Sequence, residues 1–228
     1  MTLIEVIDAA RDILNEPLST ARSFPDNSSA FWGDSTMTRY HNLVQTEVAQ
    51  EIVQSFEDHF LTDTTFDISG NQSRYALPVD FNKVRRVEDI RNANSPVEIF
   101  PVRLNEGRYR SPLGSISGLG LQGGYHLEGD SIVFDSTPTF TTNSAVRMLY
   151  IKTLADVTAG SDSSELPLVA HRALVWGIVK YCQLQQQADN IFAAQEFEKH
   201  ISNIRKQAEN RQIQTPRRVY IKRRYTGL

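Results

Sequence analysis

The sequence has one cysteine among its 228 residues, which excludes an internal disulfide and a zinc site built from several cysteines. That residue, Cys182, lies in the apolar run VWGIVKYCQL and is expected to be a buried, unreactive thiol. No stretch approaches the roughly 18 uninterrupted apolar residues that span a bilayer, so we expect no membrane partner. The acids Glu5, Asp8 and Asp12 are not typical of a signal peptide and indicate a protein kept in the cytoplasm.

Acidic residues are missing from the last part of the sequence, since none follows Glu209. The final eighteen residues carry six basic side chains, so the net charge of −3 divides into +6 there and −9 in the rest. Positive charge that is isolated in this way contributes nothing to a fold. The basic end therefore indicates a binding partner.

The common catalytic signatures are also absent: the sequence has no GxSxG elbow, no GxxxxGK[ST] loop and no HExxH pair. Residues 118–123 match GxGxxG but lack the flanking strand and helix that bind a dinucleotide, so we expect no cofactor. The histidines lie on separate predicted elements, and we expect no metal site: His41, His59, His126, His171 and His200. We predict that the protein is not an enzyme. A two-carboxylate hydrolase of cell-wall sugars stays open, because such pairs leave no spacing signature.

Helical periodicity is present at both ends of the chain. Leu3, Ile7 and Ala10 predict a first helix over residues 2–15. A second helix is expected to begin with a side-chain cap from Asp34 or Ser35. A narrow apolar stripe follows this helix and predicts that it is long and packs along a neighbour. The stripe consists of Tyr40, Val44, Val48, Ile52, Phe56 and Phe60.

Alternating strand patterns occupy the middle of the chain, from about residue 64 to residue 153. The strand-like runs are TFDIS, RYALP, KVRRVEDIR, VEIFPVRL, YHLEGD, SIVFDS and AVRMLYIK. Gly129 and Asp130 stand between two of these runs and predict a β-hairpin. The Gly-rich stretch at residues 113–124 is expected to form a mobile loop.

Helix returns at Leu166 and continues through LVAHRALVWGIVKYCQL, which is apolar on nearly all sides. Such a helix in a chain of this size predicts that a neighbouring subunit covers part of it. A fourth helix over residues 189–211 repeats apolar residues at the spacing of a helical seam. The side chains expected to pack between subunits are Tyr40, Val44, Val48, Ile52, Trp176, Phe197, Ile201 and Ile204.

These patterns predict an α+β fold, with a helical bundle from both chain ends, a central β-rich insertion and an extended C-terminal arm. The bundle comprises residues 1–62 and 161–211, the insertion residues 63–160, and the arm residues 212–228.

The arm combines charge with strand periodicity, since Val219 and Ile221 alternate with Tyr220 and Lys222. A lone terminal strand lacks a partner for its backbone groups, so it stays disordered or adds to another chain's sheet. Because the arm is rich in apolar and aromatic residues, we favour docking onto a protein. The alternative is a nucleic-acid-binding protein that acts through this basic tail.

Four segments, in this order, resemble the head-to-tail adaptor (connector) proteins of tailed bacteriophages. They are FWGDSTMTRYHNLVQTEVAQEI at residues 31–52, YALPVDF at 75–81, YHLEGDSIVFDSTP at 125–138 and MLYIKTLADVTAGSDSSELP at 148–167. The resemblance covers most of the chain and depends on the order of the segments, since no single one is specific. The Gly-rich loop after Pro112 is longer than the family pattern.

The resemblance implies a structural role at the head–tail junction of a virion, after assembly in the host cytoplasm. Such adaptors form rings, commonly of twelve copies, beneath the portal protein. They extend the channel that DNA passes through without sequence-specific binding, and they receive the next tail component. The arm residues that this role would place against the portal are Arg217, Arg218, Val219, Tyr220, Ile221, Lys222, Arg223, Arg224 and Tyr225.

Overall fold

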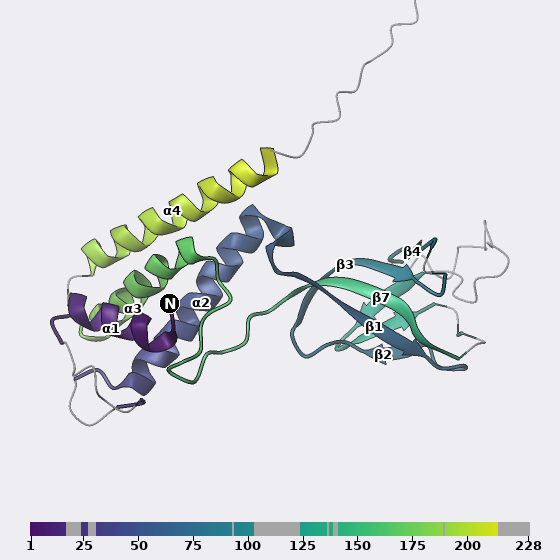
Figure 1. The fold of residues 1–228 in the computed structure, drawn as a ribbon, viewed down its shortest axis with the longest axis horizontal. Coiled ribbons are helices and arrows are strands. Elements are labelled where there is room, and N and C mark those ends of the chain that lie inside the picture. The colour runs from purple at the N-terminus through teal and green to yellow at the C-terminus, as the bar shows by residue number, and fades with distance from the viewer. Residues whose placement is uncertain are drawn as a thin grey trace, which may run out of the picture. The chain divides into compact units, whose positions relative to one another are not determined.

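The computed structural model describes residues 1–16, 24–26, 31–92, 94–102, 124–135, 137–138, 141–188 and 190–213. Most of the Gly-rich loop and the basic arm beyond residue 213 lie outside the described residues. The chain divides into two compact units (Figure 1). The helical unit comprises Met1–Phe56 and Asp156–Leu228, and the β unit comprises Glu57–Ala155.

Helix α1 spans Leu3–Ile13 and begins with a capping box between Thr2 and Glu5. The hydroxyl of Thr2 accepts a hydrogen bond from the Glu5 amide, and the Glu5 carboxylate accepts one from the Thr2 amide. One face of the helix is buried, as its periodicity predicts, through Leu3, Val6, Ile7 and Ala10.

Helix α2 spans Asp34–Ser55, and its N-terminus differs from the prediction. Gly33 is the N-cap residue and provides no side-chain hydrogen bond, so neither Asp34 nor Ser35 caps the helix. The Asp34 carboxylate binds Arg11 instead, because an unpaired buried guanidinium would be costly. The helix also ends earlier than its apolar stripe: a short 3-10 helix, η1 over Glu57–Phe60, follows it in the β unit.

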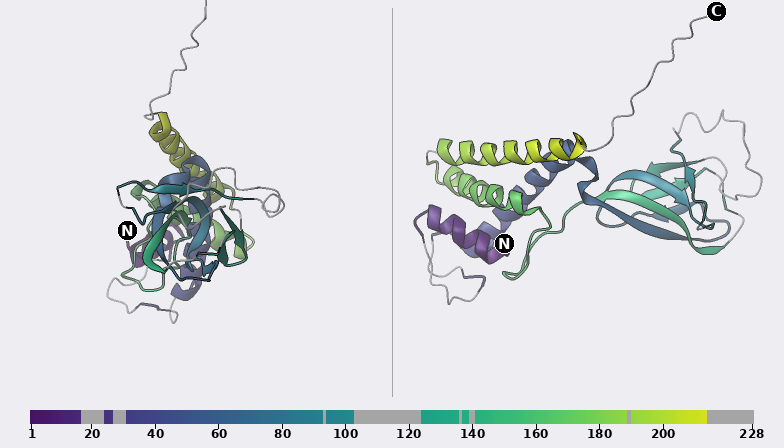
Figure 2. Two further views of the ribbon diagram at one scale, coloured as in Figure 1. Left: turned by 90° about the vertical axis from the view of Figure 1, so that its right-hand side faces the viewer. Right: turned by 45° about the horizontal axis from the view of Figure 1, so that its top comes forward.

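Helix α3 spans His171–Gln185 and starts later than predicted, after the 3-10 turn η2 at Leu168–Ala170. Helix α4 spans Ile191–Ile213. Helix α3 packs against α1, α2 and α4, and it lies between α4 and α1 in the right-hand view of Figure 2. Three helices of the same chain therefore cover most of its apolar surface, but Trp176 stays half-buried and Leu184 is 56% exposed. That a neighbouring subunit covers part of this helix stays a prediction.

The side chains predicted to pack between subunits lie mostly inside the helical unit. Buried within a single copy are Tyr40, Val44, Val48, Ile52, Phe197, Ile201 and Ile204. These seven side chains expose almost no surface in a single copy, and their packing between copies stays a prediction. Their stripes pack on helices of the same chain, and Gly177 of α3 provides the close approach to Val44 of α2. Trp176 is the exception and stays half-buried.

Every one of the predicted strand-like runs contributes a strand, which confirms the α+β class. One antiparallel sheet has the order β1-β7-β3-β4, from Leu61–Ile68, Thr142–Lys152, Phe81–Asp89 and Val97–Ile99. The other has the order β2-β6-β5, from Arg74–Ala76, Ser131–Phe134 and Tyr125–Glu128. The β5–β6 hairpin is confirmed, with Glu128 opposite Ser131 and Gly129 in the left-handed region at φ 56°.

The two sheets share one core that is rich in aromatic side chains. It includes Phe66, Tyr75, Tyr125, Phe134 and Tyr150. The hydroxyl groups of two of these reach hydrogen-bond acceptors: Tyr75 donates to the Gln72 carbonyl at 2.9 Å, and Tyr150 donates to an Asp80 carboxylate oxygen at 2.9 Å. Buried phenols therefore have partners for their polar ends.

Candidate interaction surfaces

A fully buried ion pair joins the first residue of α2 to α1. It thereby positions the α2 residues that lie on the surface of the helical unit. Arg11 Nη2 lies 2.8 Å from Asp34 Oδ1, and both side chains are 0% exposed. The same guanidinium donates to the Trp32 carbonyl, and the Asp26 amide donates to Asp34 Oδ2 at 2.8 Å. The charges thus tie the segment before α2 to α1.

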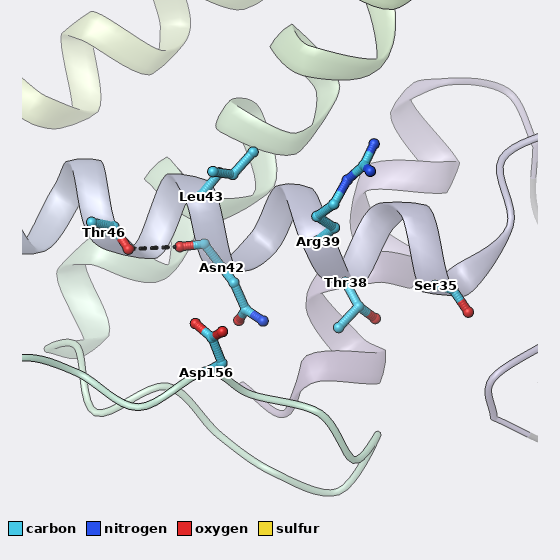
Figure 3. A pocket seen from close by; sticks show the side chains of 7 residues that line it. All are labelled: Ser35, Thr38, Arg39, Asn42, Leu43, Thr46 and Asp156. Carbon is cyan, nitrogen blue, oxygen red and sulfur yellow. Dashed lines mark hydrogen bonds between the residues drawn. The ribbon is translucent and has the colours of Figure 1, made fainter. Parts of the chain in front are cut away.

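The outer face of α2 carries a groove of about 350 Å³ (Figure 3). Its walls are formed by Ser35, Thr38, Arg39, Asn42, Leu43, Thr46 and Asp156. The Asn42 amide fixes the second wall, since its Nδ2 donates to the Val157 carbonyl and its Oδ1 accepts from the Val157 amide, both at 3.1 Å. This pair of bonds holds Asp156 opposite α2.

The groove offers one cation, one anion and one apolar side chain to a partner. Arg39 and Asp156 are both exposed, and Leu43 is 48% exposed. The Arg39 guanidinium lies 5.7 Å from the centroid of the Tyr40 ring, which orients it along the helix. A groove lined by hydroxyls, an amide and two opposite charges is suited to binding a protein surface.

A second surface lies where α3 meets α4, and we call it the aromatic edge: Arg172, Trp176, Phe192 and Glu196. The Trp176 and Phe192 rings meet edge to face with centroids 5.5 Å apart. Phe192 is 65% exposed, which is unusual for a phenylalanine in a packed helical unit. Sequence periodicity identified Trp176 but missed Phe192, whose only signal is that it lies off the buried stripe of α4.

Polar contacts lock α2 to the other two helices. The Glu47 carboxylate of α2 accepts from the Tyr181 hydroxyl and from Lys180 Nζ, the latter at 3.3 Å. Burial, then the hydrogen bond to Glu47, raises the pKa of Tyr181 to about 12. Arg205 of α4 pairs with Glu51 of α2 at 2.7 Å. The groove and the aromatic edge therefore lie on helices that these contacts join.

The family model for the SU10 adaptor protein matches residues 1–220 of the chain. The chain belongs to this family. It is a phage virion adaptor, which confirms the resemblance of the sequence to head-to-tail adaptors, and the family is one of structural proteins rather than enzymes. No curated protein matches the chain.

Among the described residues of the adaptor, no group of three or more histidine, cysteine or acidic side chains could hold a metal ion. Burial raises the pKa of the Cys182 thiol to about 12, so it stays protonated at neutral pH, as expected for an inert thiol. In the part of the chain that the structure describes, no helix is long and apolar enough to cross a membrane.

The two groups of residues that sequence analysis assigned to binding have different outcomes in the adaptor. The arm residues Arg217 to Tyr225 lie outside the described residues, and their assignment stays a prediction. Of the predicted inter-subunit residues, only Trp176 has surface to contribute to another protein. The structure brings it together with Phe192 from α4.

Proposed function

We propose that this adaptor forms a ring beneath the portal protein, commonly of twelve copies, and extends the DNA channel toward the tail. The proposal rests on two features of the chain: two units that each have their own core, and a C-terminal segment with six basic and no acidic residues. The helical unit and the β unit each bury their own core. Contacts with other virion components are therefore made by their surfaces and by the arm.

Each part has a proposed partner. The helical unit packs between neighbouring copies, the β unit faces the next tail component, and the arm docks onto the portal. The β unit has surface to offer such a partner, since Phe100 at the end of β4 is 62% exposed. The arm has both charge and strand periodicity, which is the combination that adds a strand to another protein's sheet.

The charge distribution supports a passive DNA channel. Before its last eighteen residues the chain carries a net charge of −9. An acidic wall repels the phosphate backbone, so a duplex slides along it without lasting contacts or sequence-specific binding.

Removal of residues 214–228 tests the docking of the arm, because this truncation leaves α4 complete. We expect the truncated protein to keep its circular dichroism spectrum and unfolding transition, but to lose stoichiometric binding to purified portal rings. A variant with the same arm residues in scrambled order is the matched control. Full portal binding by the truncated protein would contradict the docking of the arm.

Nucleic-acid binding through the arm is the second candidate, favoured by the five basic residues that follow residue 213. It predicts an affinity for duplex DNA that falls steeply with salt and survives scrambling of the arm, because counterion release depends on charge and not on order. The adaptor role predicts little DNA binding at moderate salt and loss of portal binding on scrambling. Gel-shift titrations at several salt concentrations separate the two.

A further inference from the structure

We propose that Trp176 and Phe192 of one copy seat in the α2 groove of the next copy. The partner of this groove is thus a second copy of the same chain, and neighbours meet through two different faces of the helical unit. The inference rests on the ring proposed above and names the surfaces that build it.

The groove and the aromatic edge lie on different faces of the helical unit. On α4, Phe192 and Glu196 lie about 140° and 180° around the helix from Arg205, at about 100° per residue, and Arg205 pairs with Glu51 of α2. The edge is therefore on the flank of α4 that points away from α2. On α2, Asn42 lies about 160° around the helix from Val44, which packs against α3. The Asn42 wall of the groove is therefore on the side of α2 that points away from α3, and Leu43 lies at the rim, about 40° around the helix from Glu47, which bonds to α3.

Two different surfaces on one unit suit a ring. A contact between two different patches is heterologous, and repeated heterologous contacts close into a ring when the rotation between copies allows it. A twofold dimer would instead use one patch on both copies. The helical unit carries two unlike patches, one concave and one with protruding aromatic side chains.

The apolar parts of the two surfaces match in kind. Phe192 is 65% exposed, Ile191 beside it is 62% exposed, and Leu43 in the groove is 48% exposed. Aromatic side chains bury about 150–250 Å² each and dominate the energetics of interfaces. A groove of about 350 Å³ is large enough to accept such a side chain.

The charges of the two surfaces are complementary. The groove presents Arg39 and Asp156, and the aromatic edge presents Arg172 and Glu196. Two pairs can form across the contact: Arg39 with Glu196, and Asp156 with Arg172. Glu196 also receives Lys199 Nζ at 3.0 Å within its own helix, an exposed pair that leaves carboxylate lone pairs available. Charges at a rim set register and partner choice more than affinity.

Cysteine cross-linking in assembled particles tests the contact. The Leu43→Cys/Phe192→Cys double variant places one thiol in the groove and one on the aromatic edge, and any ladder above the dimer requires bonds between copies. The native Cys182 is buried and does not compete. After mild oxidation we expect a ladder of covalent oligomers that extends to the full ring. Each single variant should give no ladder above the dimer.

The outcomes distinguish the two proposals. Particles that contain the double variant in normal amount but show no ladder overturn the α2-groove contact and leave the ring intact. A cross-link from the groove cysteine to a different virion protein also overturns it, since the groove then has another occupant. Wild-type particles without an adaptor ring overturn the proposed function itself.

A charge-reversal cycle gives a second measurement if the cysteine variant is poorly incorporated. Arg39→Glu alone and Glu196→Arg alone should each lower the adaptor content of particles at least tenfold, and the two together should restore most of it. Lys206→Glu is the matched control, because Lys206 is an exposed cation elsewhere on α4 and should have no effect. Lack of rescue by the double reversal, with both proteins folded, contradicts the proposal.

Discussion

The helical unit joins residues from both ends of the chain, whereas the β unit is made from the continuous segment Glu57–Ala155. Helices α1 and α2 must therefore find α3 and α4 across about a hundred intervening residues, and loop closure makes such pairing slow. The β unit pairs strands that are mostly closer in sequence. The helical unit therefore needs, more than the β unit does, contacts that specify which helices pair.

The two units also differ in how deeply an ion pair is buried. In the helical unit the Arg11–Asp34 pair is completely buried. In the β unit the comparable pair is Glu88 with Arg147, whose side chains are 4% and 39% exposed. Water reaches one member of the second pair and not the first. A buried pair is costly to break from one side, so we expect the helical unit to be the more sensitive to a single charge change.

The largest expected effect is that of Asp34→Asn, which leaves the Arg11 guanidinium buried without a carboxylate at hydrogen-bonding distance. We expect the free energy of unfolding of the helical unit to fall by about 3 kcal/mol. Both tryptophans of the sequence, Trp32 and Trp176, lie in this unit, so tryptophan fluorescence during urea unfolding measures it separately.

Two control variants test whether the loss comes from the unpaired buried charge. Arg11→Met combined with Asp34→Asn removes both charges and should recover most of the loss. Glu88→Gln in the β unit should cost less than Asp34→Asn, because its arginine partner stays partly solvated. An equal or larger loss from Glu88→Gln would contradict the proposed difference between the units.

Glycine substitutions should give the next largest effect. A Cβ on Gly177 would lie 2.4 Å from Val44 Cγ1, so Gly177→Ala forces α2 and α3 apart and should cost about 1–3 kcal/mol. Gly129→Ala in the β5–β6 turn meets no atom within 4 Å and is disfavoured only by its φ of 56°, at about 1 kcal/mol. Thermal unfolding followed by fluorescence and by circular dichroism compares the two variants. A larger loss for Gly129→Ala would show that helix spacing is less restricted than the contact implies.

Alkaline pH should weaken both units through one carboxylate-bonded tyrosine in each, Tyr150 being buried and Tyr181 half-buried. Burial, then hydrogen bonding to a carboxylate, raises the pKa of Tyr150 and of Tyr181 to about 12, from an ordinary value of 10. The folded state holds these protons more strongly than the unfolded state, so their contribution is complete below pH 10 and is lost as pH rises through 12.

Tyr181→Phe should flatten this loss in the helical unit, and Tyr150→Phe should flatten it in the β unit. The measurement is the free energy of unfolding between pH 9 and pH 12, by fluorescence for the first unit and by circular dichroism for the whole chain. A wild-type stability that does not change over this range would contradict the raised pKa values.

Surface ion pairs should have the smallest effect, and a similar one in both units. Arg205 and Glu51 join α4 to α2 with side chains 48% and 27% exposed, and Arg74 and Glu128 join strands of the β unit with 55% and 54% exposed. Arg205→Ala and Arg74→Ala should each lower stability by about 1 kcal/mol or less. A markedly larger loss for Arg205→Ala would mean that α4 depends on this pair for its position.

Local patterns predicted much of the fold. Alternating residues located the strands, Gly129-Asp130 located a hairpin, and apolar periodicity located the helices and their buried faces. The predicted helix cap was wrong because a residue with a suitable local role makes a long-range contact instead. Asp34 has the chemistry of a helix cap, but Arg11 is twenty-three positions away in the chain and no local signal indicates that it binds this carboxylate.

Apolar periodicity is enough to predict which faces of the helices and strands are buried, because the periods of 3.6 and 2 residues place apolar side chains on one side. The charge asymmetry of the chain can likewise be read from the residues alone. What covers the buried faces is seen only in the folded molecule, where the stripes of α2, α3 and α4 pack on one another within a single copy. A hydrophobic pattern measures removal from water and is the same whichever chain removes it, so only the arrangement in space separates core from interface.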